Sequence, residues 1–423
     1  MKIGLFTNTF TPHVGGVARS TQTLLEDLRR LRHRVLVVAP EFPDGPAPQS
    51  IERSVERVPA WQNFNGSDFS VRIPVALTLS ERLAKFDAGL FHAHHPFLLG
   101  DTALRMSAQR EVPIVFTHHT KYEDYTHYVS ADSPTMRRFV INLSTYFSNC
   151  CHGVIAPSES IAELIRERGV ESPIHVIPTG IDLDRFGQGR RDRWRQKLGI
   201  PDGAVVVGHV GRLAQEKNLS FLSDALIRAL RREQTAHAMI VGDGDERPPF
   251  EKKCTDAGVA ARVHFLGQRT DQALMDAYAA MDLFAFSSQS ETQGMVVAEA
   301  MAAGNPVVAL DAPGVREVVI DRENGRLLKS SASAESLARA LTKLMRDKPA
   351  LSSCRRAARQ RAKRFDRART ARETVAFYDE VRAENRVGKR PDWLPGWSGF
   401  LDRVGIEYKL LESRVSSAVD AIG

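Results

Sequence analysis

Two glutamates, Glu291 and Glu299, stand eight positions apart in a stretch of small and apolar residues. The apolar segment 281–286 predicts a buried strand, and the segment 295–303 predicts a helix that begins after Gly294. A strand–loop–helix–strand unit of this kind is typical of a parallel sheet that is covered on both faces. Free N–H groups at the start of the helix attract phosphate, and Glu299, two turns along, would accept hydrogen bonds from hydroxyl groups beside that anion. The arrangement suits the binding of a nucleotide sugar.

A second group of residues supplies positive charge at the end of another predicted strand, 204–210. Gly211 is followed there by Arg212 and, five positions later, by Lys217. A diphosphate at this edge of the sheet needs compensating charge, which an arginine supplies through two parallel hydrogen bonds and a lysine as a point charge. Taken alone, the two cations also fit the solvated start of a helix.

These residues require two α/β domains to position them. The first half of the chain alternates apolar and helical segments, with strands at 3–7, 35–39, 89–93, 113–117, 153–156 and 174–178 and helices at 17–31, 99–109, 133–149 and 158–168. The second half repeats the alternation, with strands at 204–210, 237–241, 263–266, 283–286 and 307–310 and helices at 219–232, 247–257, 271–280 and 295–303. Two such sets predict two facing Rossmann-like parallel-sheet domains. A polar segment with glycines, 187–203, is expected to be the linker between them.

The segment from Glu291 to Glu299, followed by AMAAGNPVV, is similar to the E-x7-E signature of retaining glycosyltransferase family 4. The resemblance implies the two-domain GT-B fold, in which a C-terminal helix crosses back to the first domain. We therefore expect an acceptor-side domain at 1–187, a donor-binding domain at 188–370, a crossover helix at 371–385 and an aromatic, amphipathic tail at 386–423. One departure from the family is Thr292-Gln293, where Pro-Phe is common, and it affects the shape of the sugar pocket.

The resemblance also implies roles for individual residues. Glu291 would face the donor sugar, and Glu299 would bind the ribose. Arg212 and Lys217 match the family's G-R-x4-K-N pattern for the donor phosphates. The remaining expected donor-binding residues lie in the glycine loops that follow the strands and at the start of the helix after Glu291: Gly15, Gly16, Gly211, Gly242, Gln268, Arg269, Gly294, Met295 and Val296.

Two of these matches leave an alternative open. Gly15-Gly16 resembles the family's N-terminal glycine loop because a glycine pair permits positive φ and close approach of a ligand, but a structural turn fits equally well. The family has a histidine after a first-domain strand whose side chain meets the donor sugar. The register of its T-x-H pattern selects His119 for that role, and the adjacent His118 is the alternative.

No metal or cofactor is expected beyond the nucleotide-sugar co-substrate, for which we expect UDP-glucose. Asp243-Gly244-Asp245 and Asp182-Leu183-Asp184 look like the D-x-D metal motif of another transferase fold. Each instead matches a family 4 loop, and GT-B sites use Arg, Lys and helix dipoles in place of a metal. No combination of His, Cys and Asp has the spacing of a closed metal site.

The acceptor side is expected between residues 118 and 147, where aromatic and basic residues gather. The run 118–128 closely resembles bacterial diacylglycerol glucosyltransferases of family 4, which act at the inner leaflet. The expected acceptor and membrane residues are Tyr122, Tyr125, Tyr128, Arg137, Arg138 and Phe139. Basic and aromatic surfaces of this kind suit an anionic bilayer, although an ordinary core helix is the alternative.

Composition and charge agree with a cytoplasmic enzyme that associates peripherally with a membrane. The net charge is +7, and the run 355–372 carries nine basic residues and one acid. That run suits an anionic membrane or a solvated helix, and no nucleic-acid recognition motif accompanies it. No signal peptide or membrane span is expected, and the four cysteines do not suggest a disulfide framework.

We therefore expect a retaining, metal-independent hexosyltransferase that moves glucose from UDP-glucose to a membrane lipid hydroxyl such as that of diacylglycerol. Other lipid-linked or soluble acceptors, with GDP-mannose as donor, are the enzymatic alternatives. A lipid-binding protein on a degenerate GT-B scaffold is the non-enzymatic one.

Overall fold

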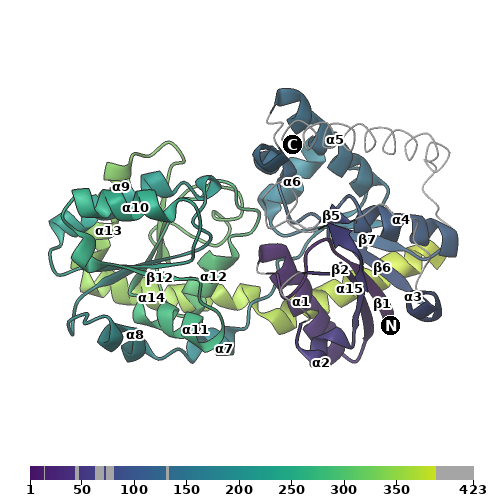
Figure 1. Cartoon of the computed structure of the whole chain (residues 1–423), viewed down its shortest axis with the longest axis horizontal. Helices are drawn as coiled ribbons and strands as arrows, with labels where there is room; N and C mark the ends of the chain where they lie inside the picture. The colour runs from purple at the N-terminus through teal and green to yellow at the C-terminus, as the bar shows by residue number, and fades with distance from the viewer. Residues whose placement is uncertain (14, 43–46, 62–70, 73–80, 130–132, 387–423) are drawn as a thin grey trace, which may run out of the picture. The chain divides into compact units, whose positions relative to one another are not determined.

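The computed structural model describes residues 1–13, 15–42, 47–61, 71–72, 81–129 and 133–386 (Figure 1). Met1–Asp379 form one compact unit, which contains two parallel sheets. We call each sheet, with its helices and the loops after its strands, the first and the second lobe. The expected tail beyond Arg386 lies outside the described residues, and the domain boundaries expected near 187, 370 and 385 stay predictions.

The first lobe is built on a seven-stranded sheet in which all strand pairs are parallel. In spatial order its strands are β3 (Val55–Val58), β2 (Arg34–Pro40), β1 (Lys2–Phe6), β6 (Leu90–Ala93), β7 (Ile114–Thr117), β8 (Gly153–Ala156) and β9 (Ile174–Val176). The central strands β6, β7 and β8 are buried along their whole length. Their continuous apolar runs follow from having helices on both faces of the sheet.

Among the described residues, this lobe also contains seven helical segments and a small antiparallel pair of strands. They are α1 (Gly16–Arg30), α2 (Gln49–Glu52), α3 (Glu81–Lys85), α4 (Leu99–Arg110), the 3-10 helix η2 (Tyr122–Val129), α5 (Pro134–Asn149), α6 (Glu159–Glu167), β4 (Ala60–Trp61) and β5 (Val71–Arg72). Ser158 caps α6, since its hydroxyl accepts a hydrogen bond from the N–H of Ile161.

The second lobe has a six-stranded parallel sheet. In spatial order its strands are β12 (Val263–Gly267), β11 (His237–Val241), β10 (Val206–Val210), β13 (Leu283–Phe286), β14 (Val307–Leu310) and β15 (Gly325–Leu328). Its helical segments are α7 (Leu183–Gly187), α8 (Arg191–Lys197), η3 (Gln215–Lys217), α9 (Leu219–Arg232), α10 (Arg247–Asp256), η4 (Ala260–Arg262), α11 (Asp271–Ala280), α12 (Met295–Ala302), α13 (Ala334–Arg346), α14 (Lys348–Ala362) and η5 (Lys363–Phe365).

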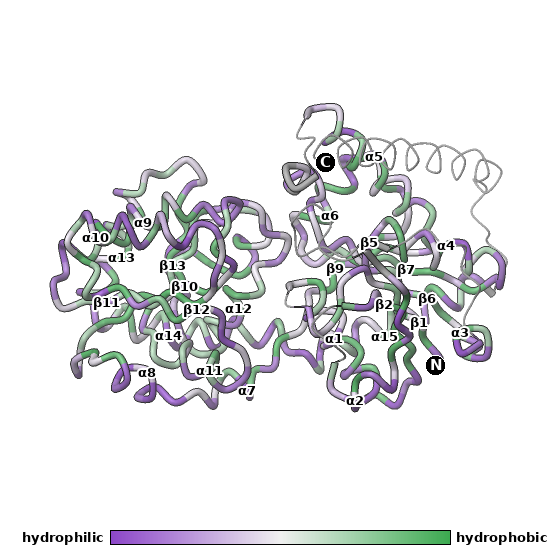
Figure 2. Tube along the Cα trace, in the orientation of Figure 1, coloured by the Kyte–Doolittle hydropathy of each residue, from purple (hydrophilic) through white to green (hydrophobic). Residues whose placement is uncertain are grey.

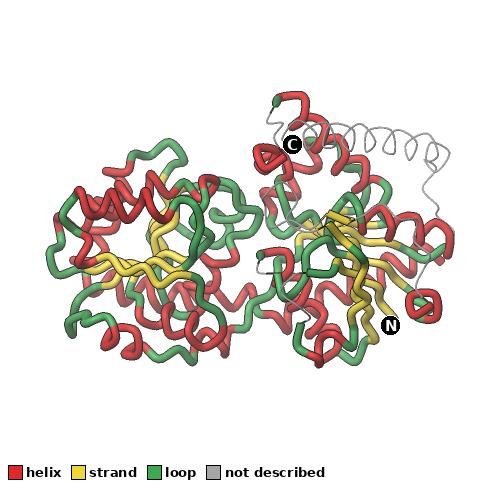
Figure 3. The backbone as a smooth tube through the Cα atoms, viewed as in Figure 1, coloured by secondary structure: helices red, strands yellow, loops and turns green. Residues whose placement is uncertain are grey.

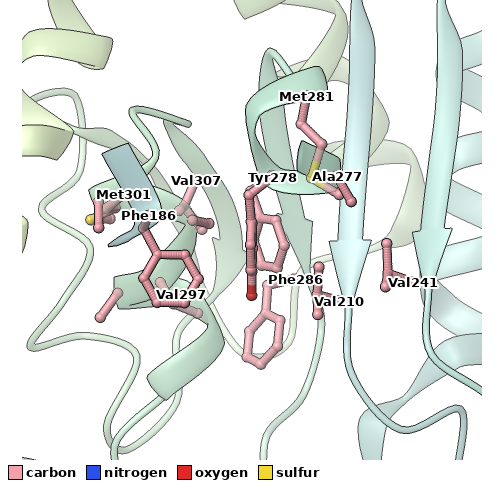
Figure 4. Packing of buried hydrophobic residues seen from close by; sticks show 14 of the residues in the cluster. Phe186, Val210, Val241, Ala277, Tyr278, Met281, Phe286, Val297, Met301 and Val307 are labelled. Carbon is pink, nitrogen blue, oxygen red and sulfur yellow. The ribbon is translucent and has the colours of Figure 1, made fainter. Parts of the chain in front are cut away.

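Hydrophobic cores lie on both faces of this second sheet, with helices on each side in Figure 3. Successive residues of a strand point to opposite faces, so Val206 and Val210 enter one core while Val207 enters the other. In the first of these cores Tyr278 stands between Phe186 and Phe286 (Figure 4), with its ring 5.5 Å from that of Phe186. This packing fixes the Tyr278 ring in the core to which β13 and α12 also contribute.

The segment 187–203, expected to be a polar linker, instead contains α8, which belongs to the second lobe. Most of α8 is hydrophilic (Figure 2), but Trp194 is buried and donates its indole N–H to the carbonyl of Ala273 at 3.0 Å. Arg195 forms a buried ion pair with Asp282. This helix was not predicted because contacts with distant residues stabilise it and its own polar sequence does not suggest it.

The last helix among the described residues, α15 (Arg367–Arg386), contacts the first lobe as the GT-B resemblance implies. Its Arg367 pairs with Asp27 of α1 at 2.7 Å, and the Tyr378 hydroxyl lies 2.6 Å from His92 of β6. The helix begins at Arg367, four residues earlier than expected.

Candidate active site

Lys217 and Glu291 meet at the carboxyl ends of β10 and β13. Lys217 ends η3 in the loop after β10, and its ammonium donates to Glu291 Oε1 at 2.6 Å. Burial by itself would raise the pKa of Glu291, but attraction to Lys217 and hydrogen bonds from Lys217 and Ser288 outweigh it and lower that pKa. Glu291 is therefore a carboxylate at neutral pH, held beside a cation.

The helix that follows this loop begins at a glycine, as its sequence predicts. Gly294 precedes α12 with φ +68, a left-handed conformation that favours glycine. Its carbonyl accepts from the N–H groups of Val297 and Ala298. The N–H groups of Met295 and Val296 belong to the first turn, where the helix offers them no carbonyl of its own, so they are suited to an anion.

Glu299 is buried inside α12, with 1% of its surface exposed, and both carboxylate oxygens have partners. Tyr278 donates to Oε2 at 2.9 Å, and Arg19 of α1 pairs with Oε1 at 3.0 Å. Attraction to Glu299 raises the pKa of Arg19 despite burial. The expected ribose-binding carboxylate is thus held by a tyrosine of its own lobe and an arginine of the first lobe.

Arg212 and two glycine loops lie next to the Lys217 loop. The Arg212 side chain is 43% exposed and pairs with Glu216. Gly211 donates to the carbonyl of Val241, and a Cβ at Gly242 would come within 1.8 Å of the Gly211 carbonyl oxygen. Gly242 therefore has a structural reason to be glycine, namely close packing of the two loops.

Gln268 and Arg269, two of the expected donor-binding residues, follow β12 and are exposed. The Arg269 guanidinium lies over the Trp194 ring, 5.5 Å from its centre. In the structure, Arg269 therefore takes part in a cation–π contact within the second lobe.

Of the two neighbouring histidines, His118 is buried and His119 is partly exposed. His118 packs edge-on against Phe116 and Tyr122, and burial lowers its pKa to about 4. The His119 ring lies 2.9 Å from His94, and burial lowers its pKa well below the usual value. His119 is therefore neutral at neutral pH, and its exposure favours it over His118 for contact with a ligand.

The glycine pair of the first lobe does not adopt positive φ. Gly15 precedes α1 with φ −166, an extended conformation open to any residue. Nothing lies within 4 Å of a Cβ built on Gly16. The expectation of positive φ at this pair is therefore wrong. Open space for close approach of a ligand remains at Gly16.

Acidic pairs that resemble metal motifs are engaged in structural contacts. Asp243 accepts from the N–H of Gly244 and pairs with Arg247, and Asp182 caps α7 through the N–H of Arg185. Across the part of the chain that the structure describes, no group of three or more His, Cys, Asp or Glu side chains is arranged to hold a metal ion.

Comparison with known proteins assigns the chain to a family. Residues 190–361 match the family described as "Glycosyl transferases group 1", and residues 14–185 match "Glycosyltransferase Family 4". The chain is 30% identical to an alpha-monoglucosyldiacylglycerol synthase of Streptococcus pneumoniae over 77% of its own length and 75% of the relative. It is 31% identical to a GDP-mannose-dependent alpha-mannosyltransferase of Mycobacterium tuberculosis, over 78% and 84%. Among solved structures, Anabaena Alr3699/HepE in complex with UDP-glucose superposes with a TM-score of 0.71 at 25% identity, over 90% of this chain and 100% of that one.

The chain is a family 4 glycosyltransferase.

The region expected to be the acceptor side includes an incompletely covered helix, α5. Its buried residues are Ser144, Phe147 and Ser148, all in the C-terminal half. In the N-terminal half Arg137 and Arg138 are exposed and Phe139 is half-buried. Basic and apolar side chains therefore reach the surface together, as the sequence predicts. None of the helices among the described residues is both long and apolar enough to cross a bilayer.

Tyr122, Tyr125 and Tyr128 all fall in η2. Tyr122 is partly buried, and its ring packs edge-on against Phe97 and His118. The side chains of Tyr125 and Tyr128 lie outside what the structure describes. Tyr122 thus contributes to packing, and its expected acceptor role stays a prediction.

Much of the basic run 355–372 is engaged inside this glycosyltransferase. Arg355 pairs with Asp282 at 2.8 Å, Arg361 donates to the carbonyl of Glu317, and Arg367 pairs with Asp27. These arginines brace the second lobe and α15, so only part of the run remains for an anionic partner.

Sequence reasoning missed Arg19, Tyr278 and Gln293 as residues near the site. Arg19 follows the glycine pair in α1 and contacts Glu299, and the Gln293 amide pairs with the backbone of Thr179. The departure from Pro-Phe at Thr292-Gln293 drew attention to this residue pair, but nothing in the sequence predicted its partners in the first lobe.

Proposed function

We propose that this protein is a retaining, metal-independent glycosyltransferase that moves glucose from UDP-glucose to the hydroxyl of a membrane lipid, diacylglycerol. The observation that carries the proposal is the Lys217–Glu291 pair, 2.6 Å long, in the loop that leads to Gly294 and α12. It joins a cation, a carboxylate and a helix N-terminus at one edge of the sheet. That combination suits a phosphate and a sugar side by side.

In the proposed reaction, positive charge stabilises the departing UDP. Arg212, Lys217 and the first N–H groups of α12 would neutralise the charge that builds on the diphosphate as the bond to the sugar breaks. Stabilisation of the leaving group of this kind is usually the largest electrostatic contribution to such a transfer. Glu299 would hold the ribose hydroxyls.

Glu291 and His119 would act on the sugar itself. The carboxylate of Glu291, kept ionised by Lys217, stabilises positive charge on the oxocarbenium-like sugar, and the neutral ring of His119 orients it through a hydrogen bond. The lipid hydroxyl attacks the anomeric carbon on the face that UDP leaves, so the configuration is retained. Its proton passes to an oxygen of the departing phosphate.

The acceptor would reach the site from the surface of an anionic bilayer. Arg137 and Arg138 on α5 are exposed beside half-buried apolar residues, a pattern that suits the inner leaflet. The alpha-monoglucosyldiacylglycerol synthase relative is consistent with diacylglycerol as the acceptor. We place the protein in the cytoplasm, peripherally attached to that leaflet.

The decisive test offers radiolabelled UDP-glucose, UDP-galactose, UDP-glucuronate and GDP-mannose to the full-length protein with diacylglycerol vesicles. We expect label from UDP-glucose in a lipid product whose anomeric carbon keeps the α configuration of the donor. Chelation of divalent cations should leave the rate unchanged. A β-linked product or a requirement for a metal would contradict the proposed mechanism.

Mannosyl transfer from GDP-mannose is the second candidate, favoured by the 31% identity to the mannosyltransferase relative. Label from GDP-mannose alone would select it. Release of UDP or GDP in the presence of vesicles also separates both enzymes from a degenerate, lipid-binding scaffold.

A further inference from the structure

The loop that carries Glu291 is tied to the first lobe by two consecutive residues, Thr292 and Gln293. Thr292 donates its hydroxyl to the carbonyl of His119 at 2.7 Å and accepts at its own carbonyl from the Ser158 hydroxyl at 2.6 Å. Gln293 contacts Thr179. His119, Ser158 and Thr179 follow β7, β8 and β9, three adjacent strands of the first sheet. One short loop therefore spans the ends of three neighbouring strands.

Gln293 makes the most specific of these contacts. Its Oε1 accepts from the N–H of Thr179 at 2.7 Å, and its Nε2 donates to the carbonyl of the same residue at 2.8 Å. Only 5% of Gln293 is exposed. A side-chain amide can donate and accept at once, whereas a carboxylate only accepts. The pairing thus selects a primary amide of this length.

Contacts on either side reinforce this pairing. The Thr179 hydroxyl lies 2.8 Å from that of Ser20, whose neighbour Arg19 pairs with Glu299. Behind the loop, a Cβ on Gly314, where φ is +74, would come within 2.5 Å of the Gln293 backbone nitrogen. The loop is therefore held by α1 and Thr179 on one side and supported by Gly314 on the other.

We propose that Gln293 is a positioning residue that locks the Glu291 loop against the first lobe, so that Glu291 and His119 meet the same sugar. Resting on the function proposed above, the inference names the contact that assembles its site. Glu291 is two residues from Gln293, and Thr292 between them holds the carbonyl of His119. Loss of the Gln293 pairing would let the two sugar-facing residues move apart.

The kinetic test compares Gln293→Ala and Gln293→Glu with the wild type in the vesicle assay. A misplacement of about 1 Å at a reacting centre lowers rates by up to about 100-fold. We therefore expect kcat to fall by about 10- to 100-fold in both variants. The affinity for UDP, measured by calorimetry, should stay close to that of the wild type because Arg212, Lys217 and α12 all belong to the second lobe. Unchanged kcat, or a loss of UDP affinity as large as the loss of kcat, would overturn the proposal.

Gln289→Ala is the matched control. Gln289 lies in the same loop, and its amide donates to the carbonyl of Ser330 at 2.9 Å, within the second lobe. We expect this variant to keep the kcat of the wild type. A loss equal to that of Gln293→Ala would assign the effect to the loop in general and contradict a specific role for Gln293.

A distance measurement tests the lock without any activity. All four cysteines are buried, so spin labels can be attached to cysteines introduced at exposed Glu167 and Gln234, one in each lobe. We expect one narrow distance distribution in the labelled parent and a broader one in the Gln293→Ala background. Equal distributions would overturn the proposal. If the protein transferred no hexose, the proposed function would fail while this measurement still decided the role of Gln293.

Discussion

The two glutamates of the E-x7-E pair are held in contrasting ways. Glu291 lies in a loop, and its partner Lys217 comes from the neighbouring strand end of the same lobe. Glu299 lies inside α12, fully buried, and depends on Arg19 from the first lobe as well as on Tyr278. The charged partner of the first carboxylate therefore comes from its own lobe, whereas the charged partner of the second comes from α1 of the first lobe.

This difference separates two kinds of preorganisation. The Lys217–Glu291 pair needs only the parallel register of β10 and β13, in which Val207 pairs with Leu283. The Arg19–Glu299 pair and the Gln293–Thr179 pair need both lobes in contact. We infer that charge for the donor phosphates is prepared within the second lobe, and that contacts from the first lobe orient Glu299 toward the ribose and Glu291 toward the sugar.

Removal of the Lys217–Glu291 pair should have the largest effect. Loss of one preorganised electrostatic group typically lowers kcat by about 100- to 1,000-fold, and we expect a loss of that order in both Glu291→Gln and Lys217→Ala. Circular dichroism and thermal melting should show that both variants remain folded. Near-normal transfer of hexose by either variant would contradict the proposed mechanism, because it would show that catalysis does not need the Lys217–Glu291 pair.

How much of the fold could be predicted from the sequence depends on where each element lies. Buried strands such as β8, β11 and β14 were predicted with their observed bounds, because an apolar run between helices is a local signal. The edge strand β15 was missed, since three of its four residues are only half-buried. Helix α8 was missed because burial of Trp194 depends on Ala273, 79 residues away.

The candidate site shows the same difference between residues with a local sequence signal and residues placed by distant contacts. The pairing of Lys217 with Glu291 brings together two residues that separate motifs had predicted. Arg19 and Gln293 carried no such signal, because their partners belong to the other lobe and no periodicity or spacing encodes that contact. The catalytic and binding roles of all these residues stay predictions.

Loss of Arg19 should have a smaller effect than loss of Lys217 and should fall on donor binding. In Arg19→Ala, Glu299 keeps Tyr278 but loses a charged partner, so its orientation toward a ribose becomes less fixed. Although the Arg19 side chain is 43% exposed, Glu299 is buried, so loss of its charged partner should also lower the free energy of unfolding. A charge-assisted hydrogen bond of moderate strength corresponds to about a three- to tenfold rise in KM for the donor.

Lys2→Ala provides the control for Arg19→Ala. Lys2 lies at the N-terminal end of β1 and pairs with Asp87, and its side chain is 34% exposed. We expect unchanged KM in this variant. Equal effects of the two substitutions would show that Glu299 does not depend on the first lobe and would weaken the contrast between the glutamates.

The smallest expected effect concerns pH and stability, and it tests why Glu291 is ionised. Because Lys217 lowers the pKa of Glu291 below its usual 4.5, the ionised carboxylate stabilises the folded protein above that pH, and this contribution is lost as pH falls through the lowered value. Urea unfolding should therefore show the stability of the wild type relative to Glu291→Gln decreasing as the pH is lowered from about 5.

Lys217→Ala should reverse the sign of this dependence. Burial, the largest influence on Glu291, would then raise its pKa above 4.5, since the hydrogen bond from Ser288 opposes it only in part. The folded state would bind a proton more tightly than the unfolded state, so stability relative to the Lys217→Ala/Glu291→Gln double variant should fall as pH rises above about 4.5. If the pH dependence of stability were the same with and without Lys217, a group other than Lys217 would keep Glu291 ionised. That result would contradict the inference that Lys217 prepares this charge.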